Sequence, residues 1–135
     1  MTHTLIQHPD ALAVVRLGPG SDVPSWATAS TLFSVTATKT ETSIVCHAST
    51  VPTKARREGP FVAFEVAGPL DFAETGVLSG LLAPLADAGI SVFTLSTYDT
   101  DWILVKADAA DAAAEAWTAA GHTLTTPTED SKEQS

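Results

Sequence analysis

The chain has 135 residues, 44% of them hydrophobic, and its 16 acidic and 7 basic residues give a net charge of −9. This length accommodates one ordinary domain, or two small units, with a real hydrophobic core. The acidic balance argues against a nucleic-acid-binding protein, because such proteins neutralise phosphates with clustered Lys and Arg. Acidity of this kind is typical of a surface that keeps a protein soluble.

The sequence shows no feature that is typical of a membrane protein or a secreted protein. No apolar run approaches the roughly 20 residues that a membrane-spanning helix requires. The first ten residues lack the basic start and apolar core of a secretory signal, and the single Cys46 excludes an internal disulfide. We therefore expect a cytoplasmic protein without membrane attachment.

The first elements in chain order are short. Residues 1–10 show no periodicity, which predicts a loose start. Residues 11–17 form an apolar run that ends at a Gly-Pro-Gly sequence, which predicts a strand. Residues 21–30 leave room for at most two helical turns, with Pro24 in the first turn.

A β-hairpin is expected next, with residues 32–38 and 43–47 flanking a polar turn. Ile44 and Cys46 alternate with other residues as on a half-buried strand, which favours an inert core cysteine over a nucleophile. Residues 48–59 then become polar and basic. We interpret this stretch as the boundary between two units.

The second half of the chain alternates strand and helix patterns. Asp71 and Glu74 have the spacing of a capping box, and the leucines that follow keep one helical face apolar. Pro84 is expected to kink or shorten this helix, and Gly89 to end it. Asp108 is expected to cap a second, alanine-rich helix. The predicted strands cover residues 61–67, 90–96, 102–107 and 122–125.

This order, β-α-β-β-α-β, predicts an α+β fold of the ferredoxin-like kind, with the helices on one face of an antiparallel sheet. The first hairpin aligns without gaps on the second, which places Thr38 on Thr97 and Thr42 on Asp101. Such an internal repeat predicts two tandem units, the first one trimmed. The expected division is residues 1–59 for the partial unit, 60–126 for the complete unit and 127–135 for a disordered tail.

Catalytic constellations are scarce. The four His residues are scattered without metal-ligand spacing, and no GxSxG, HExxH or glycine-rich phosphate loop is present. These observations favour a binding protein over an enzyme, and we expect no catalytic activity and no cofactor. A small enzyme remains the weaker alternative.

Binding chemistry is expected where the strand that ends at residue 67 leads into the next helix. The first helical turn leaves backbone N–H groups unpaired, and these suit a carboxylate. A nearby acidic side chain, Glu74, Asp99 or Asp101, would receive an ammonium or guanidinium group, so that together they select a free amino acid. The alternative is that Glu74 is a simple cap and that Asp99 and Asp101 are turn formers.

The sequence GPLDFAETGVLSGLLAPLADAGISVFTLSTYDTDWILVK, residues 68–106, resembles ACT domains, which bind small molecules. It is similar in particular to the bacterial tandem-ACT family of predicted amino-acid-binding proteins. That family is related to the aspartate-kinase regulatory region and to the CASTOR-type arginine sensors. With FSVTATKTETSIVC the similarity extends over residues 11–124. It implies a ferredoxin-like ACT sandwich and a regulatory protein that binds an amino acid.

The resemblance also implies a site between two ACT domains. Since the animal sensors carry four such units and this chain two, we expect a homodimer that signals to a separate, unidentified protein partner. The ligand would be arginine or another polar amino acid, with Asp101 facing its side chain. The residues implied as ligand-binding are Glu74, Gly76, Val77, Ser91, Val92, Thr97, Tyr98 and Asp101. The alternative is a ligand-free module in which Tyr98 and its turn contact another protein.

Overall fold

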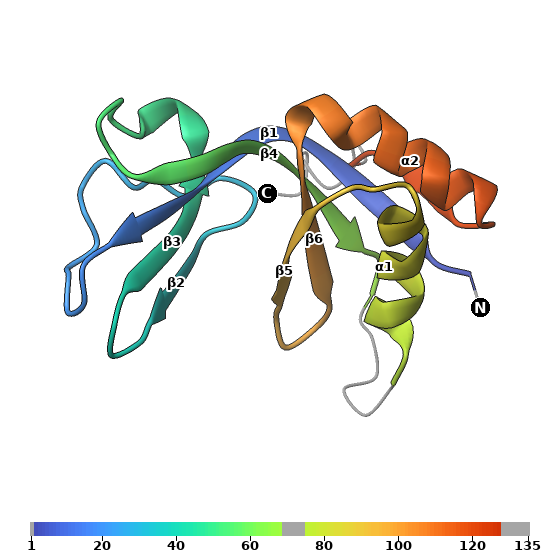
Figure 1. The fold of residues 1–135 in the computed structure, drawn as a ribbon, viewed down its shortest axis with the longest axis horizontal. Helices are drawn as coiled ribbons and strands as arrows, with labels where there is room; N and C mark the ends of the chain where they lie inside the picture. The colour runs from blue at the N-terminus through green and yellow to red at the C-terminus, as the bar shows by residue number, and fades with distance from the viewer. Residues whose placement is uncertain (1, 69–74, 128–135) are drawn as a thin grey trace. The chain divides into compact units, whose positions relative to one another are not determined.

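The structure, a computed structural model, describes residues 2–68 and 75–127 (Figure 1). The chain divides into two compact units, which we call unit 1 (residues 1–9 and 62–135) and unit 2 (residues 10–61). The strands β1 (Thr4–Leu17) and β4 (Arg57–Val66) each contribute residues to both units. The sequence predicted a division at residue 59, with the first nine residues in the partial unit. In the structure these nine residues belong to unit 1, together with the second half of the chain.

Unit 2 is built from strands. The strands β2 (Ser34–Ala37) and β3 (Thr42–His47) form the predicted antiparallel hairpin, and the order of strands in this unit is β2-β3-β1-β4. Ile44 and Cys46 are fully buried, as their alternation predicts. They pack with Ala13, Val15 and Val51 in the core of the unit.

The helical turns predicted for residues 21–30 are wrong. This segment contains one turn, in which the amide of Ala27 donates to the carbonyl of Pro24 at 3.0 Å, and unit 2 has no α-helix. A little further on, the carbonyl of Thr28 accepts the amide of His47 at 3.0 Å. The segment therefore uses its backbone to bond to the end of β3. The one short helical element of unit 2 is a 3₁₀ turn, Ala48–Thr50.

Unit 1 has the predicted β-α-β-β-α-β order from β4 onward. Its further elements are α1 (Val77–Asp87), β5 (Val92–Ser96), β6 (Asp101–Lys106), a 3₁₀ turn (Ala107–Ala109), α2 (Ala110–Ala119) and β7 (Thr123–Thr125). The strands β5 and β6 pair antiparallel, as predicted. The order of strands in the sheet of this unit is β5-β6-β4-β1-β7.

The loose start predicted for residues 1–10 is wrong, because β1 begins at Thr4. Thr4–Ile6 pair with Thr123–Thr125 in parallel, and Leu5 is fully buried. The first part of β1 thus lies between β4 and β7 in unit 1. A pairing between segments almost 120 residues apart leaves no local signal in the sequence.

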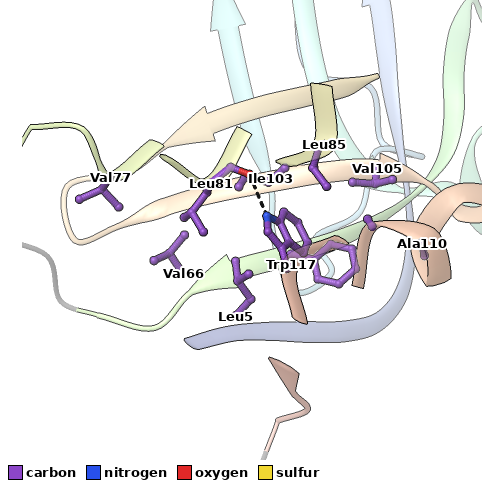
Figure 2. Packing of buried hydrophobic residues seen from close by; sticks show 11 residues of the cluster. Leu5, Val66, Val77, Leu81, Leu85, Ile103, Val105, Ala110 and Trp117 are labelled. Carbon is purple, nitrogen blue, oxygen red and sulfur yellow. Dashed lines mark hydrogen bonds between the residues drawn. The ribbon is translucent and has the colours of Figure 1, made fainter. Parts of the chain in front are cut away.

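Both helices pack on one face of the sheet of unit 1, as predicted (Figure 2). In β6, Ile103 and Val105 belong to this core, whereas the alternate residues Trp102 and Leu104 do not. Trp117 is the largest side chain in the core; its indole N–H donates to the carbonyl of Leu81 at 2.8 Å. The fully or largely buried residues of this core are Leu5, Phe64, Val66, Val77, Leu81, Leu85, Ile103, Val105, Ala110, Ala113 and Trp117.

The helix ends differ in part from the predictions. Gly89 follows α1 at a φ of 75°, in the left-handed region, as predicted, and α1 continues through Pro84 to Asp87. Asp108 lies in the 3₁₀ turn and makes no capping bond to α2, so its predicted role as a cap is wrong. The capping box at residues 71–74 and most of the tail predicted for residues 127–135 lie outside the described residues.

Candidate functional site

The end of β4, the start of α1 and the turn between β5 and β6 lie toward one end of unit 1 (Figure 1). The buried hydroxyl of Thr100, in this turn, donates to the carbonyl of Val66 at 2.6 Å and so fixes the turn to β4. Figure 2 likewise shows Val66 and Val77 toward the same end of the core. The helix start and the hairpin turn, where the sequence predicts a site, therefore both lie toward this end.

The turn itself is closed by Thr97. Its amide donates to the carbonyl of Thr100 at 2.8 Å, and its hydroxyl contacts both the carbonyl and the amide of Thr100, at 3.1 and 3.3 Å. Thr38 makes the same three bonds to Glu41 in the hairpin of unit 2, at 2.9, 3.3 and 3.1 Å. The gapless alignment of Thr38 on Thr97 thus corresponds to a shared turn geometry.

Asp101 begins β6 directly after this turn. It lies opposite Ser96, whose hydroxyl donates to the Asp101 carboxylate at 2.6 Å. The side chain is partly exposed. Asp101 is therefore an oriented carboxylate that can still accept a donor from a ligand. Tyr98, at the tip of the turn, is 84% exposed.

The start of α1 offers hydrogen-bond donors. Gly76 is the residue before the helix, at a φ of 82°; as a glycine it has no side chain to cap the first turn, and that turn contains no acidic residue. The first backbone N–H groups of a helix have no partner within the helix, and the helix dipole makes this end attractive to anions. Gly76 and Val77 line a cavity of about 160 Å³, together with His3, Thr75, Gly80 and His122.

Sequence reasoning missed the two histidines in this cavity. His3 and His122 are 119 positions apart, and only the parallel pairing of β1 with β7 brings them together. Their rings stack with centroids 5.9 Å apart, and the Nδ1 atom of His122 accepts the backbone amide of His3 at 3.0 Å. Burial, and secondarily the charge of His3, lower the pKa of His122. His122 is therefore neutral at pH 7.

Ser91 and Val92 lie away from the hairpin turn. Val92 pairs with Val105, whereas Ser96 pairs with Asp101, so the two pairs are four residues apart along β5. At the rise of a β-strand this separation is about 13 Å. A single copy thus places Gly76, Val77, Thr97, Tyr98 and Asp101 at one end of unit 1 and Ser91 and Val92 toward the other. Glu74 lies outside the described residues.

A second cavity, of about 230 Å³, lies at the same end of unit 1. It is lined by Glu65, Gly68, Asp99 and Thr100. Its carboxylate Glu65 is already paired with His8, whose ring stacks on Trp102. Asp101 lines neither of the two cavities.

The part of the chain that the structure describes offers little support for a cysteine nucleophile or a metal site. Cys46 is buried, and burial raises the pKa of its thiol, so it lacks the thiolate character of a nucleophile. No group of three or more His, Cys, Asp or Glu side chains in residues 2–68 and 75–127 has the arrangement of a metal site. Within the same residues, no helix combines the length and apolar character needed to cross a membrane.

The fold and this site define an α+β module with helices on one face of its sheet. Residues 56–118 match the ACT domain family, and residues 10–54 match a separate N-terminal domain family. This part of the chain is therefore similar to an ACT domain. The chain shares its family with Atu0741 of Agobacterium tumefaciens, a solved structure with 31% sequence identity, a TM-score of 0.86 and 96% coverage of both chains.

Two further proteins are similar to the chain, one in fold and one in a short stretch of sequence. VC0802 of Vibrio cholerae, a protein of unknown function, shares the fold with a TM-score of 0.71 and 14% identity, over 87% of this chain and 89% of its own. The human protein CASTOR3P is 61% identical over 31 residues, which are 23% of this chain and 19% of CASTOR3P. The chain thus spans about a fifth of that curated relative.

Proposed function

We propose that this protein is a non-catalytic sensor that binds a free amino acid and regulates a partner protein. The observation that supports this proposal best is that the start of α1 and Asp101 lie at the same end of one compact unit. The helix start, where Gly76 has no side chain to act as a cap, offers donors for a carboxylate, and Asp101 offers an acceptor for an ammonium or guanidinium. The resemblance of residues 68–106 to the CASTOR-type arginine sensors favours a ligand of the arginine kind.

The proposal includes a homodimer. Ser91 and Val92 lie about 13 Å along β5 from the level of Asp101, so they do not reach the same small ligand within one copy. In a two-fold dimer they would come from the second copy. The ligand would then lie between two ACT domains and favour the arrangement that it binds more tightly. The shared turn of the two hairpins supports the further idea that unit 2 is a trimmed copy of the same fold.

The test is thermal unfolding and calorimetry with each of the twenty amino acids at millimolar concentration. A ligand at 100 times its Kd raises the free energy of unfolding by about 2.7 kcal/mol. Asp101→Ala should weaken binding of the amino acid found by ~2–5 kcal/mol if the contact is a buried ion pair. Asp87→Ala, at the far end of α1, is the matched control and should leave binding unchanged. If none of the twenty stabilises the protein, the sensor is excluded.

A second function is favoured by Tyr98, which is 84% exposed at the tip of the hairpin turn. Tyr is enriched among the residues that dominate protein–protein interfaces. In this alternative the turn contacts another protein without any ligand. Co-purification of a partner that is lost in Tyr98→Ala and insensitive to added amino acids would favour this alternative over the sensor.

A further inference from the structure

The strand β2 lies at the edge of the sheet and pairs with β3 on one side (Figure 1). Next to their turn, the amide of Thr38 donates to the carbonyl of Glu41 at 2.9 Å. Along an antiparallel pair, residues that exchange hydrogen bonds alternate with residues that do not. Thr36 is therefore the next residue that bonds to β3, and the backbone groups of Val35 and Ala37 point away from it. This outer side of β2 offers N–H and C=O groups to a further strand.

The side chains at this edge are apolar and incompletely covered. Phe33, directly before β2, shares one face with Val35, because side chains alternate along an extended backbone. Opposite Val35 lies Ile44, which is fully buried in the core of unit 2. Phe33 and Val35 nevertheless remain 38% and 42% exposed. Residues 33–37 also contain none of the prolines or charged side chains that keep edge strands from pairing.

This edge is complementary to itself. By the same alternation, the outward backbone groups are those of residues 33, 35 and 37, which are symmetric about Val35. An antiparallel contact with its two-fold axis at Val35 places Val35 opposite Val35, and Phe33 opposite Ala37 of the second copy. Every outward group of this stretch then has a partner. A register shifted by one residue would instead set Val35 opposite Thr36, whose backbone groups already bond to β3.

Charged groups at the two ends of this contact match as well. In the same register, the exposed Lys39 lies opposite residue 31 of the second copy. The hydroxyls of Ser30 and Thr31 donate to one carboxylate oxygen of Asp10, at 2.6 and 2.7 Å. These bonds, that of Ser30 first, lower the pKa of Asp10, so its carboxylate is charged at pH 7. A Lys39 ammonium thus meets an oriented carboxylate at both ends of the contact.

The net charge of unit 2 permits two copies to approach. Residues 10–61 contain five of the seven basic residues and four of the 16 acidic residues, which is a formal net charge of +1. The whole chain carries −9, so the repulsion between copies arises outside unit 2. This balance favours a second copy of the chain over a strongly charged partner at β2.

We propose that unit 2 joins two copies of this protein by antiparallel pairing of β2 with β2 of the second copy. The two-fold axis passes through Val35, and Lys39 pairs with Asp10 of the second copy at each end. This contact requires no amino acid. It therefore does not rest on the proposed function, whose ligand belongs to unit 1.

The test is sedimentation equilibrium of the full chain without added amino acid, together with amide hydrogen exchange by NMR. We expect a monomer–dimer equilibrium in which the amides of Phe33, Val35 and Ala37 exchange more slowly at higher protein concentration. The amides of Ser34 and Thr36 bond to β3 in both states, so their exchange should depend much less on concentration. A chain that stays monomeric at about 1 mM would overturn the inference. Exchange of the three outward amides that ignores concentration would do the same.

Two variants address the backbone and the charges separately. Val35→Pro removes the central outward N–H and no bond to β3, so it should weaken the dimer about tenfold or more. Lys39→Glu should weaken it about three- to tenfold, because it sets two carboxylates together at each end. Lys54→Glu makes the same change in net charge at an exposed position outside residues 31–39, and should leave the dimer unchanged.

The reversed ion pair provides a rescue. Asp10→Lys combined with Lys39→Glu should dimerise more tightly than Lys39→Glu alone. If Val35→Pro fails to fold, the charge variants and the exchange of the wild type decide. A dimer that forms only with an added amino acid and keeps fast exchange at Val35 would support the sensor and exclude this interface. A dimer with slow exchange at Val35, in a protein that binds none of the twenty amino acids, would keep the interface and exclude the sensor.

Discussion

Trp117 shows how one side chain joins the two helices of unit 1. Its ring is fully buried in α2, packs edge-on against Phe64 at a centroid distance of 4.8 Å, and bonds through its indole N–H to the carbonyl of Leu81 in α1 (Figure 2). The proposed site begins at the first turn of this same α1. The position of the site therefore depends on core packing that the ligand does not touch.

The substitution Trp117→Phe should lower the free energy of unfolding by ~2–4 kcal/mol. It removes the donor to Leu81 and leaves a small void, and both changes are destabilising in a buried position. Urea unfolding measures the change. The exposed neighbour substitution Thr118→Ala should cost less than ~1 kcal/mol. Equal losses in both variants would contradict the role of Trp117.

His122 predicts a pH dependence of stability. Its pKa is lowered in the folded protein, mainly by burial, so the unfolded chain takes up a proton first as the pH falls through about 6.5. Acidification from that pH to the lowered folded pKa therefore reduces the free energy of unfolding. We expect this slope in urea unfolding of the wild type and a weaker slope in His122→Gln. A wild type that gains stability in this range would contradict the assignment.

At the scale of elements, two glycines at and within α1 have different roles. Gly76 precedes the helix at a φ of 82°, a conformation that glycine adopts easily and alanine does not. Gly80 lies inside the helix, and its φ is not in that region. A Cβ would meet no atom within 4 Å at either position. Sterically the two sites are therefore equivalent, and the backbone conformation distinguishes them.

The matched pair Gly76→Ala and Gly80→Ala should change stability in opposite directions. Gly76→Ala should destabilise by about 1–2 kcal/mol, because alanine must enter the left-handed region. Gly80→Ala should stabilise by up to about 1 kcal/mol, because it removes glycine from a helix interior. Thermal unfolding of both variants at one pH tests the pair. A loss of stability in Gly80→Ala would contradict the helix-propensity argument for residue 80.

At the scale of the whole molecule, the two ends of the chain build one unit. The first part of β1 pairs with β7, and this pairing creates the cavity of His3 and His122. The N-terminal residues are therefore part of the core of unit 1 and of the candidate site, and a truncation that removes them should affect both.

The substitution Leu5→Ala tests this integration. Leu5 is fully buried in the core of unit 1, so its truncation should lower the free energy of unfolding by ~2–5 kcal/mol. Gln7→Ala, two residues further along β1, serves as the control and should change it by less than about 1 kcal/mol. Equal, small effects in urea unfolding would mean that the start of β1 is dispensable.

The sequence by itself determined the elements whose signals are local. The alternation of Ile44 and Cys46, the leucine periodicity of α1 and the polar turn at Thr97 predicted a hairpin, a helix and a second hairpin, and the structure confirms them. These features depend on backbone preferences and on burial of one face, and both act over a few residues. The helices on one face followed from the same periodicities.

Tertiary structure alone decided the rest. It turned the expected loose start into a strand, replaced helical turns near Thr28 with a bond to His47, and placed His3 beside His122. Each of these outcomes depends on which distant backbone groups satisfy one another's hydrogen bonds. A local pattern does not encode that choice, because the partner lies tens of residues away.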